Sequence, residues 1–137
     1  MSNVETVQQG YEAFGRGDIP AILEMLAEDV RWEHHPTGNT AQDQDVPYMR
    51  SRSGREGAAG FFQDIDEDFE MHSFNPHSFL EGDGLVAAVI EYELTVTATG
   101  KRVRDEEIHI WEFGSDGKVT AFRHSLDTAK AIEAHQP

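Results

Sequence analysis

The stretch EEIHIWEFGSDGKVTAFRHSLDT, residues 106–128, carries the main signal for the fold. Its first part places an aromatic ring at every second position from His109 to Phe113, as expected for a strand with one covered face. Asp116-Gly117 is then a strong signal for a turn between antiparallel strands. We therefore expect a β-hairpin with strands at residues 101–113 and 118–126.

Two more turn signals, Asp83-Gly84 and Thr99-Gly100, precede this hairpin. They separate two further expected strands, at residues 72–82 and 85–98. Because all the turns between the strands are short, the second half of the chain is expected to form an antiparallel meander.

Helical spacing dominates the first half of the chain, where apolar residues recur three or four positions apart. Helices followed by a run of strands are typical of an α+β domain with the helices packed on one face of the sheet. The 137 residues show no repeat or linker, so we expect a single domain over residues 1–137. The remaining expected elements are a helix around Val4–Phe14, a helix at Ile19–Ala27, a strand at Val30–His34, a helix at Gly57–Phe69 and a helix at Thr128–Ala134 capped by Asp127.

The Thr99-Gly100 signal also predicts which side chains share a face of the sheet. A two-residue loop there pairs Tyr92 with Glu107 and Ile90 with His109, and cross-strand partners share a face. Since the alternate positions of the preceding strand are almost all apolar, this should be the covered face. Its expected members are Val86, Ala88, Ile90, Tyr92, Leu94, Val96, Asp105, Glu107, His109, Trp111 and Phe113.

Three histidines are expected to converge on that covered face. A loop of two or four residues in the last hairpin keeps His124 on the face of His109, whereas a three-residue loop turns it away. Alternation along the early strand places His34 on the side of Trp32, so that His35 points outward. If the strand ends earlier, His34 is an exposed strand end.

The composition excludes several classes of protein. The net charge is −15, from 26 acidic and 11 basic residues, which disfavours nucleic acid and anionic membranes as partners. The absence of cysteine excludes disulfides, thiolate zinc sites and thiol catalysis. No apolar run approaches the roughly 20 residues of a membrane span, and no signal-peptide pattern begins the chain, so we expect a cytoplasmic protein.

Two further regions are expected to take part in binding. Residues 36–56 are polar with two prolines and read as a long loop that gates a pocket. The outer sheet face combines charges with apolar groups such as Ile108 and Ile110, which makes it a candidate homodimer surface.

Three segments carry a family resemblance: GYEAFGRGDIPAILEMLAEDVRWE (10–33), SGREGAAGFF (53–62) and residues 106–128 quoted above. Together they resemble the SnoaL-like branch of the nuclear-transport-factor-2-like superfamily, which includes ketosteroid isomerases, limonene-epoxide hydrolases and polyketide cyclases. The resemblance implies a cone-shaped α+β fold, in which a curved mixed or antiparallel sheet wraps three N-terminal helices around a deep apolar pocket. It does not imply one reaction, because a fold hosts many functions.

The resemblance also implies positions for the site. Ketosteroid isomerases carry their catalytic base where His34 or His35 stands here, and strand alternation favours His34. Their oxyanion-hole Asp corresponds to His109, and an Asp of the epoxide hydrolases corresponds to His124. Those hydrolases have an Arg where this chain has Glu107. Since histidines replace the carboxylates, neither of those two activities carries over directly.

We therefore expect His109, His34 and His124 to be catalytic, because imidazole titrates near neutral pH and suits proton transfer. Glu107 or Asp105 would raise the pKa of His109 and fix its tautomer. The expected reaction is isomerase- or cyclase-type acid–base chemistry on a small, largely apolar carbonyl compound, without a cofactor or metal. The expected substrate-binding residues are Tyr11, Trp32, Phe61, Phe62, Tyr92, Glu107, Trp111 and Phe122.

Other interpretations of the same residues stay open. The aromatic residues are core residues by default, and a histidine on an apolar strand face is commonly a satisfied core group. A binding module without chemistry would use the same cone to hold a hydrophobic molecule. The three histidines could also hold zinc with an open coordination position, although they lack neighbouring ligands at the usual motif spacing.

Overall fold

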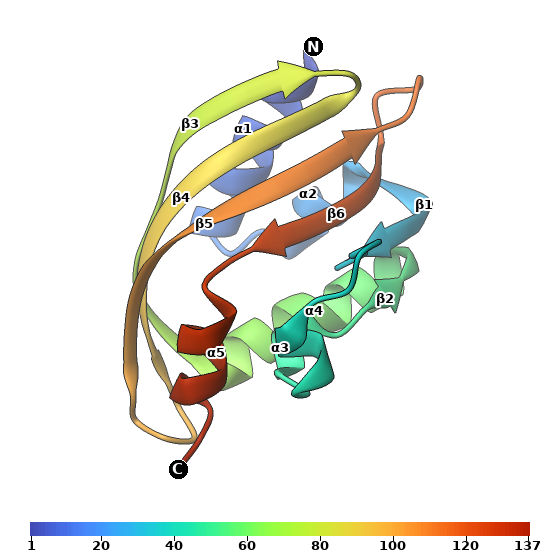
Figure 1. The fold of residues 1–137 in the computed structure, drawn as a ribbon. Coiled ribbons are helices and arrows are strands. Elements are labelled where there is room, and N and C mark those ends of the chain that lie inside the picture. The colour runs from blue at the N-terminus through green and yellow to red at the C-terminus, as the bar shows by residue number, and fades with distance from the viewer.

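A computed structural model describes residues 1–137, and its helices lie on the hollow side of one curved sheet (Figure 1). Helices α1 and α4 pack against the sheet, and α2 packs between them. The C-terminal α5 lies within the curve formed by β4 and β5. The helices are α1 (Asn3–Gly15), α2 (Ile19–Glu24), α3 (Thr40–Asp43), α4 (Gly54–Asp68) and α5 (Thr128–Ala134), with a 3₁₀ turn, η1, at Pro47–Met49.

The sheet has six strands in the order β2-β1-β6-β5-β4-β3. β1 runs parallel to β6, and every other neighbouring pair is antiparallel. The expected α+β architecture, a curved mixed sheet around the N-terminal helices, is thus confirmed. The strands are β1 (Leu26–Trp32), β2 (Arg52–Ser53), β3 (Phe69–Gly82), β4 (Leu85–Val96), β5 (Arg102–Phe113) and β6 (Val119–Ser125).

Side-chain caps begin several helices. Asp127 accepts a hydrogen bond from the backbone N–H of Lys130, as expected, and Ser2 and Asp18 cap α1 and α2 in the same way. The helix expected to reach Ala27 ends at Glu24 instead. The next residues enter β1 because pairing with β6 overrides their helical spacing.

The register between β4 and β5 differs by two residues from the expected one. Ile90 lies opposite Glu107 instead of His109. The loop is longer than expected, because the N–H of Val96 closes it by donating to the carbonyl of Lys101. Two residues are one full period of side-chain alternation, so both strands keep their expected faces.

The last hairpin confirms the expected face of His124. His109 lies directly opposite His124, and Trp111 lies opposite Phe122. A bulge between Glu112 and Phe113 shifts the register beside the turn, and the pairs beyond the bulge are regular. The two histidines are therefore cross-strand neighbours on the covered face.

The segment expected to be an irregular loop is folded instead. Residues 36–53, here called the strap, contain α3, η1 and β2, and they bury Tyr48 and Met49. The Gln42 side-chain amide donates to the carbonyls of Glu33 and Met49, at 3.0 and 2.7 Å. Polar composition concealed this packing because few apolar side chains are needed to anchor a short segment.

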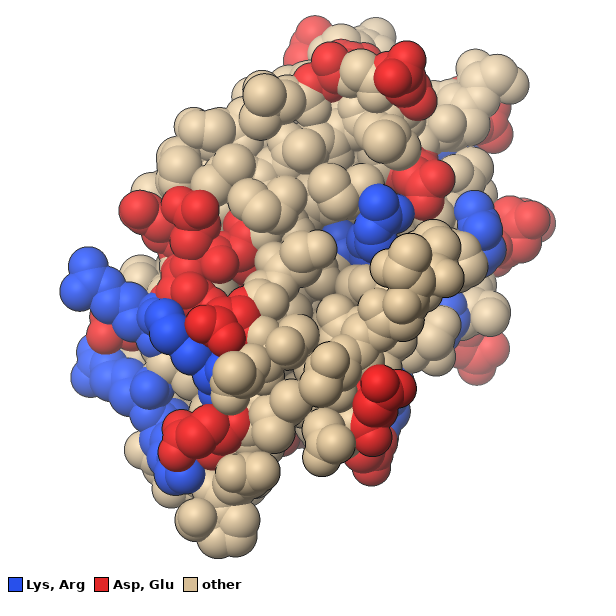
Figure 2. Space-filling model, in the orientation of Figure 1, with Lys and Arg blue, Asp and Glu red and all other residues tan.

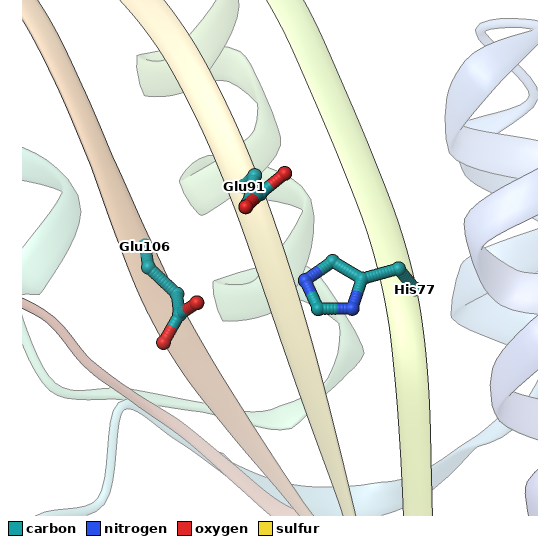
Figure 3. A group of neighbouring side chains, drawn as sticks. All are labelled: His77, Glu91 and Glu106. Atoms are coloured by element: carbon teal, nitrogen blue, oxygen red, sulfur yellow. The ribbon is translucent and has the colours of Figure 1, made fainter.

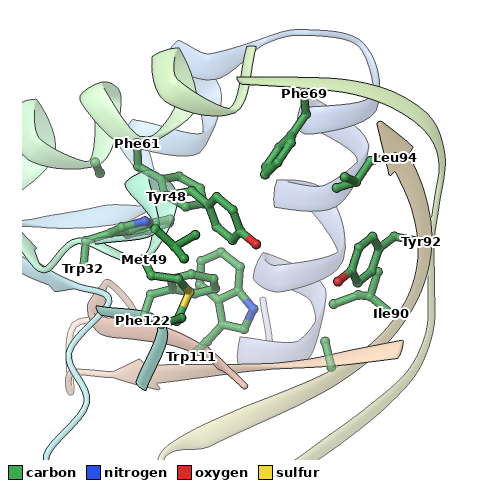
Figure 4. Close-up of a cluster of buried hydrophobic side chains, with 14 of the residues drawn as sticks. Trp32, Tyr48, Met49, Phe61, Phe69, Ile90, Tyr92, Leu94, Trp111 and Phe122 are labelled. Carbon is green, nitrogen blue, oxygen red and sulfur yellow. The ribbon is translucent and has the colours of Figure 1, made fainter. Parts of the chain in front are cut away.

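The interior is aromatic and contains four buried polar side chains. Figure 4 shows the rings of the core facing one another between the strap, α4 and the sheet. The buried polar residues are Glu33, Glu107, His109 and His124. Burying such groups is costly unless each finds a partner, so their partners locate the site.

Charged side chains lie on the outside. Figure 2 shows acidic groups scattered over one face, with Lys and Arg gathered mainly at one end beside acidic groups. No helix has both the length and the apolar character needed to cross a bilayer.

Candidate functional site

A cavity of about 80 Å³ lies between the helices, the strap and the covered face of the sheet. Most of its lining is apolar or aromatic. It contains every residue predicted for the site except His34. These residues are Tyr11, Trp32, Phe61, Phe62, Tyr92, Glu107, His109, Trp111, Phe122 and His124.

His34 does not join the other two histidines, so its expected place in the pocket is wrong. The strand ends at Trp32, and Glu33 takes a left-handed backbone conformation with φ of 55°. This turn breaks the alternation on which the expectation for His34 rested. His34 lies outside the cavity, with its Nε2 3.2 Å from a guanidinium nitrogen of Arg31. The side chain of His35 is buried instead, with its Nε2 3.5 Å from Glu33.

His109 has both ring nitrogens occupied by protein groups. Its Nε2 lies 2.9 Å from Glu107 Oε1, and its Nδ1 lies 2.7 Å from the hydroxyl of Tyr11. That hydroxyl accepts a hydrogen bond from Trp111 Nε1 at 3.0 Å, so its own proton is available for Nδ1. His109 thus links Tyr11 to Glu107 and keeps no nitrogen for a ligand. The predicted pairing with Glu107 is confirmed, whereas Asp105 lies beside Lys130 and α5.

Glu107 lies at the inner end of this chain of hydrogen bonds. Burial alone would raise the pKa of Glu107, but its interaction with the His109 ring, with which it shares a hydrogen bond, and the charge of His124 lower it. The side chain is thus a carboxylate at neutral pH. Its second oxygen has no protein hydrogen-bond partner, and Glu107 lines the cavity.

His124 has one ring nitrogen occupied and one free. Its Nδ1 lies 2.8 Å from the carboxylate of Glu33, and Nε2 has no protein partner. Burial alone would lower the pKa of His124, but the charge and hydrogen bond of Glu33 raise it to about 9. At neutral pH His124 is therefore an imidazolium whose Nε2–H is available to the cavity.

Glu33 is the main site residue that the sequence prediction missed. Alternation placed it on the outside of the strand, yet its side chain is fully buried. The left-handed conformation turns it inward, and glutamate gives no sequence signal for that conformation.

Two tyrosine hydroxyls add neutral donors. Figure 4 shows the hydroxyls of Tyr48 and Tyr92 pointing into the space between the strap and β4. Burial raises the pKa of both phenols, and the charge of Glu107 raises it further. Both stay protonated and bond to no protein group. Tyr48, which also stacks on His124 with ring centroids 5.7 Å apart, was missed because it lies in the expected loop.

The possible metal ligands lie elsewhere. Since His34 is outside the cavity and both nitrogens of His109 are occupied, the three histidines do not form a ligand set. Figure 3 shows His77, Glu91 and Glu106 from three adjacent strands with side chains close enough to hold an ion. All three are exposed on the outer face, so this group is separate from the cavity.

Comparisons with known proteins agree with this architecture. An NTF2-like protein of unknown function from Burkholderia pseudomallei is 29% identical, with 100% of each chain covered and a TM-score of 0.81. An NTF2-like protein from Burkholderia xenovorans is 26% identical over 98% of this chain and 95% of that one, with a TM-score of 0.82. A proposed SnoaL-like polyketide cyclase from Mesorhizobium loti shares the fold at 22% identity, covering 91% of this chain and 99% of its own, with a TM-score of 0.69.

No protein of curated function matches the sequence. The model of the SnoaL-like domain matches residues 7–122, which is most of the chain. The match covers α2, α3, α4, the strap, most of α1 and the sheet up to the first half of β6, and it ends two residues before His124. By sequence and by fold, this chain belongs to the SnoaL-like domain family.

Proposed function

We propose that the chain binds a small, largely apolar carbonyl compound in the cavity and catalyses isomerase- or cyclase-type acid–base chemistry on it. One observation carries this proposal: a charged donor, His124, and a carboxylate, Glu107, both line one aromatic cavity. A low-dielectric cavity strengthens the interaction of such groups with a developing charge.

The two groups take complementary roles. The Nε2–H of His124 donates to the carbonyl oxygen, while the carboxylate of Glu107 removes a proton from the adjacent carbon. The electron pair moves to the oxygen as an enolate, which His124 stabilises. Returning the proton to another carbon isomerises the compound, whereas attack of the enolate carbon on a second carbonyl of the same molecule closes a ring.

The roles differ from the expected ones because histidine is the donor here and carboxylate is the base. His109 and Tyr11 are positioning residues, since they hold Glu107 through its first oxygen and their own polar atoms already bond protein groups. Tyr48 and Tyr92 supply further neutral donors for polar atoms of the substrate.

The size of the cavity limits the substrate. About 80 Å³ is well below the roughly 300–1,000 Å³ of pockets for drug-sized ligands. The compound is therefore small, or the strap moves to admit a larger one. Because the strap contributes Tyr48 to the lining, its movement would widen the cavity beside His124.

A binding module without chemistry is the second candidate function. The observation that favours it is the occupation of both His109 nitrogens, which leaves one carboxylate oxygen as the only base facing the cavity. In that case the same donors orient a ligand that is not turned over.

The outer sheet face is proposed as a homodimer surface. Ile108 and Ile110 are half-buried there, and the same face also carries charged side chains such as Arg102 and Glu93, which form an ion pair at 2.9 Å. Two copies of a face that carries both signs of charge can pair with self-complementary contacts.

Deuterium exchange tests the proposed chemistry directly. We would incubate the protein in deuterium oxide with cyclopentanone, a small apolar ketone, and with β-tetralone, a larger aromatic ketone that requires the strap to move. Loss of the α-protons of each ketone is followed by NMR. The proposal predicts exchange faster than the buffer rate, abolished by Glu107→Gln. Glu67→Gln, which changes an exposed glutamate of α4 that accepts a hydrogen bond from Gln63, is the matched control and should leave the rate unchanged.

Two results would separate the candidates. Saturable binding of β-tetralone without any exchange above buffer favours the binding module. Native mass spectrometry of freshly purified protein adds a second test, because a retained molecule without a carbonyl group would contradict the proposed substrate class.

A further inference from the structure

Glu33 has an unusual position for a charged residue. Its side chain is completely buried at the point where β1 ends, and its backbone φ is 55°. A left-handed conformation is unfavourable for a residue with a side chain, and such strain persists where the surrounding structure holds it in place. The buried charge and the left-handed backbone each cost free energy of folding, so we examined which contacts they make possible.

Those contacts converge on His124. Glu33 Oε1 accepts the backbone N–H of His124 at 2.9 Å, and the carboxylate lies 2.8 Å from Nδ1 of the same residue. On its other side the carboxylate lies 3.5 Å from Nε2 of His35. Glu33 thus sits between two histidines and directs one of them, through Nδ1, to present Nε2 to the cavity.

A structural role alone would need only the backbone contact. The bond to the His124 N–H joins the end of β1 to β6, and an uncharged amide oxygen would accept that proton equally well. The contact with Nδ1 is different because a carboxylate stabilises a positive charge on the ring. Charge, more than shape, is what Glu33 adds to the site.

Every group that faces His124 is identifiable. Glu33 approaches from the end of β1 and Glu107 from β5, and both are carboxylates that favour the charged ring. The ring of His109 lies across the strand pair at 5.7 Å, and the phenol of Tyr48 stacks from the strap. Only Glu33 bonds the His124 ring directly, so it dominates the charge state of that ring.

We propose that Glu33 is the positioning residue of His124. It bonds Nδ1 of the His124 ring and keeps the ring protonated at neutral pH, so that Nε2–H donates a hydrogen bond to an oxygen atom of the ligand. The proposal rests on the proposed function for what the donor meets, but the charge state itself needs no ligand. It assigns the ligand at least one strong acceptor oxygen, a carbonyl or an enolate, at the end of the cavity beside Tyr48.

The proposal is tested by measuring the protonation of the His124 ring as a function of pH. NMR observes this protonation in protein whose histidines are labelled with nitrogen-15. The signals are assigned by their loss in His124→Gln. In the wild-type protein we expect both ring nitrogens of His124 to stay protonated up to a pH of about 9. In Glu33→Gln, which keeps an oxygen for the backbone N–H, we expect the midpoint to fall to or below the ordinary value of 6.5.

Asp68→Asn is the matched control. Asp68 lies 3.1 Å from Nε2 of His135, so it forms another carboxylate–histidine pair, away from Glu33. Its removal should leave the titration of His124 unchanged. Glu33→Asp, which restores the charge on a shorter side chain, should recover part of the raised midpoint.

Two outcomes would overturn the proposal: a midpoint near 6.5 for His124 in the wild-type protein, or an unchanged midpoint in folded Glu33→Gln. If Glu33→Gln does not fold, the titration midpoints of His124 in the wild-type protein and in Glu33→Asp still test the proposal. The result is also independent of the proposed chemistry, because absence of α-proton exchange would refute that chemistry and leave the titration as it is.

Discussion

His109 and His124 are neighbours across two strands, with ring centroids 5.7 Å apart, yet the structure treats them differently. Each contacts a buried carboxylate. The ring of His109 is bonded on both sides, by Glu107 and Tyr11, whereas the ring of His124 is bonded on one side only. Residue type and burial are thus insufficient to assign a role, and the decisive property is which nitrogen remains free.

Replacing each histidine gives the sharpest test of this difference. Loss of one preorganised donor to a developing oxyanion costs about 100-fold or more in rate, so His124→Phe, which keeps a ring but removes the donor, should slow exchange by that amount, while His109→Gln should slow it about tenfold or less. In the His109→Gln variant the introduced side-chain amide can still donate to Glu107, which keeps the base in place. Equal losses in the α-proton exchange assay would remove the distinction between the two residues.

The two histidine–carboxylate pairs, His124 with Glu33 and His109 with Glu107, also determine how the free energy of unfolding depends on pH. The pKa of His124 is raised, so its contribution to stability is complete below pH 6.5 and is lost as the pH rises through about 9. The pKa values of Glu33 and Glu107 are lowered, so their contributions are complete above pH 4.5 and are lost as the pH falls through the lowered values.

Denaturant unfolding at a series of pH values should therefore show maximum stability between about pH 4.5 and 6.5 and a decline towards pH 9. The alkaline decline should be much smaller in Glu33→Gln, because its His124 is already neutral there. A decline of the same size in both proteins would mean that another group causes it.

The smallest expected effects come from two tyrosines. Tyr11→Phe removes the acceptor of Trp111 and a partner of His109, and a buried polar group left unpaired costs about 1–3 kcal/mol. Tyr48→Phe removes a hydroxyl without a protein partner, so the free energy of unfolding should change by about 0.5 kcal/mol or less. Chemical denaturation measures both, and a large loss in Tyr48→Phe would show that its hydroxyl has a structural role.

Much of the fold followed from local patterns. The turn signals between the strands and the alternation along them predicted the meander and its covered face, and the spacing of apolar residues predicted the helices. The β4–β5 loop was misjudged by two residues without consequence, because that error preserves the face of every side chain. An error of one residue would have moved His109 to the outside.

The site was predictable where it depends on that alternation and not where it depends on backbone irregularity. His109, His124 and Glu107 follow from strand parity. Glu33 and His34 lie on the sides opposite to those expected because the backbone of Glu33 is left-handed. A glutamate in the sequence gives no signal for that conformation. Tyr48 was hidden because a short polar segment folds through tertiary contacts that local patterns do not contain.

A crystal structure of the protein with β-naphthol, an aromatic mimic of the enol of β-tetralone, tests the central claim most directly. The account predicts the naphthol oxygen about 3 Å from Nε2 of His124, a normal hydrogen-bond distance, with the neighbouring ring carbon facing Glu107. Binding outside the cavity, or inside it with the oxygen turned away from His124, would contradict the assignment of His124 as the donor and Glu107 as the base.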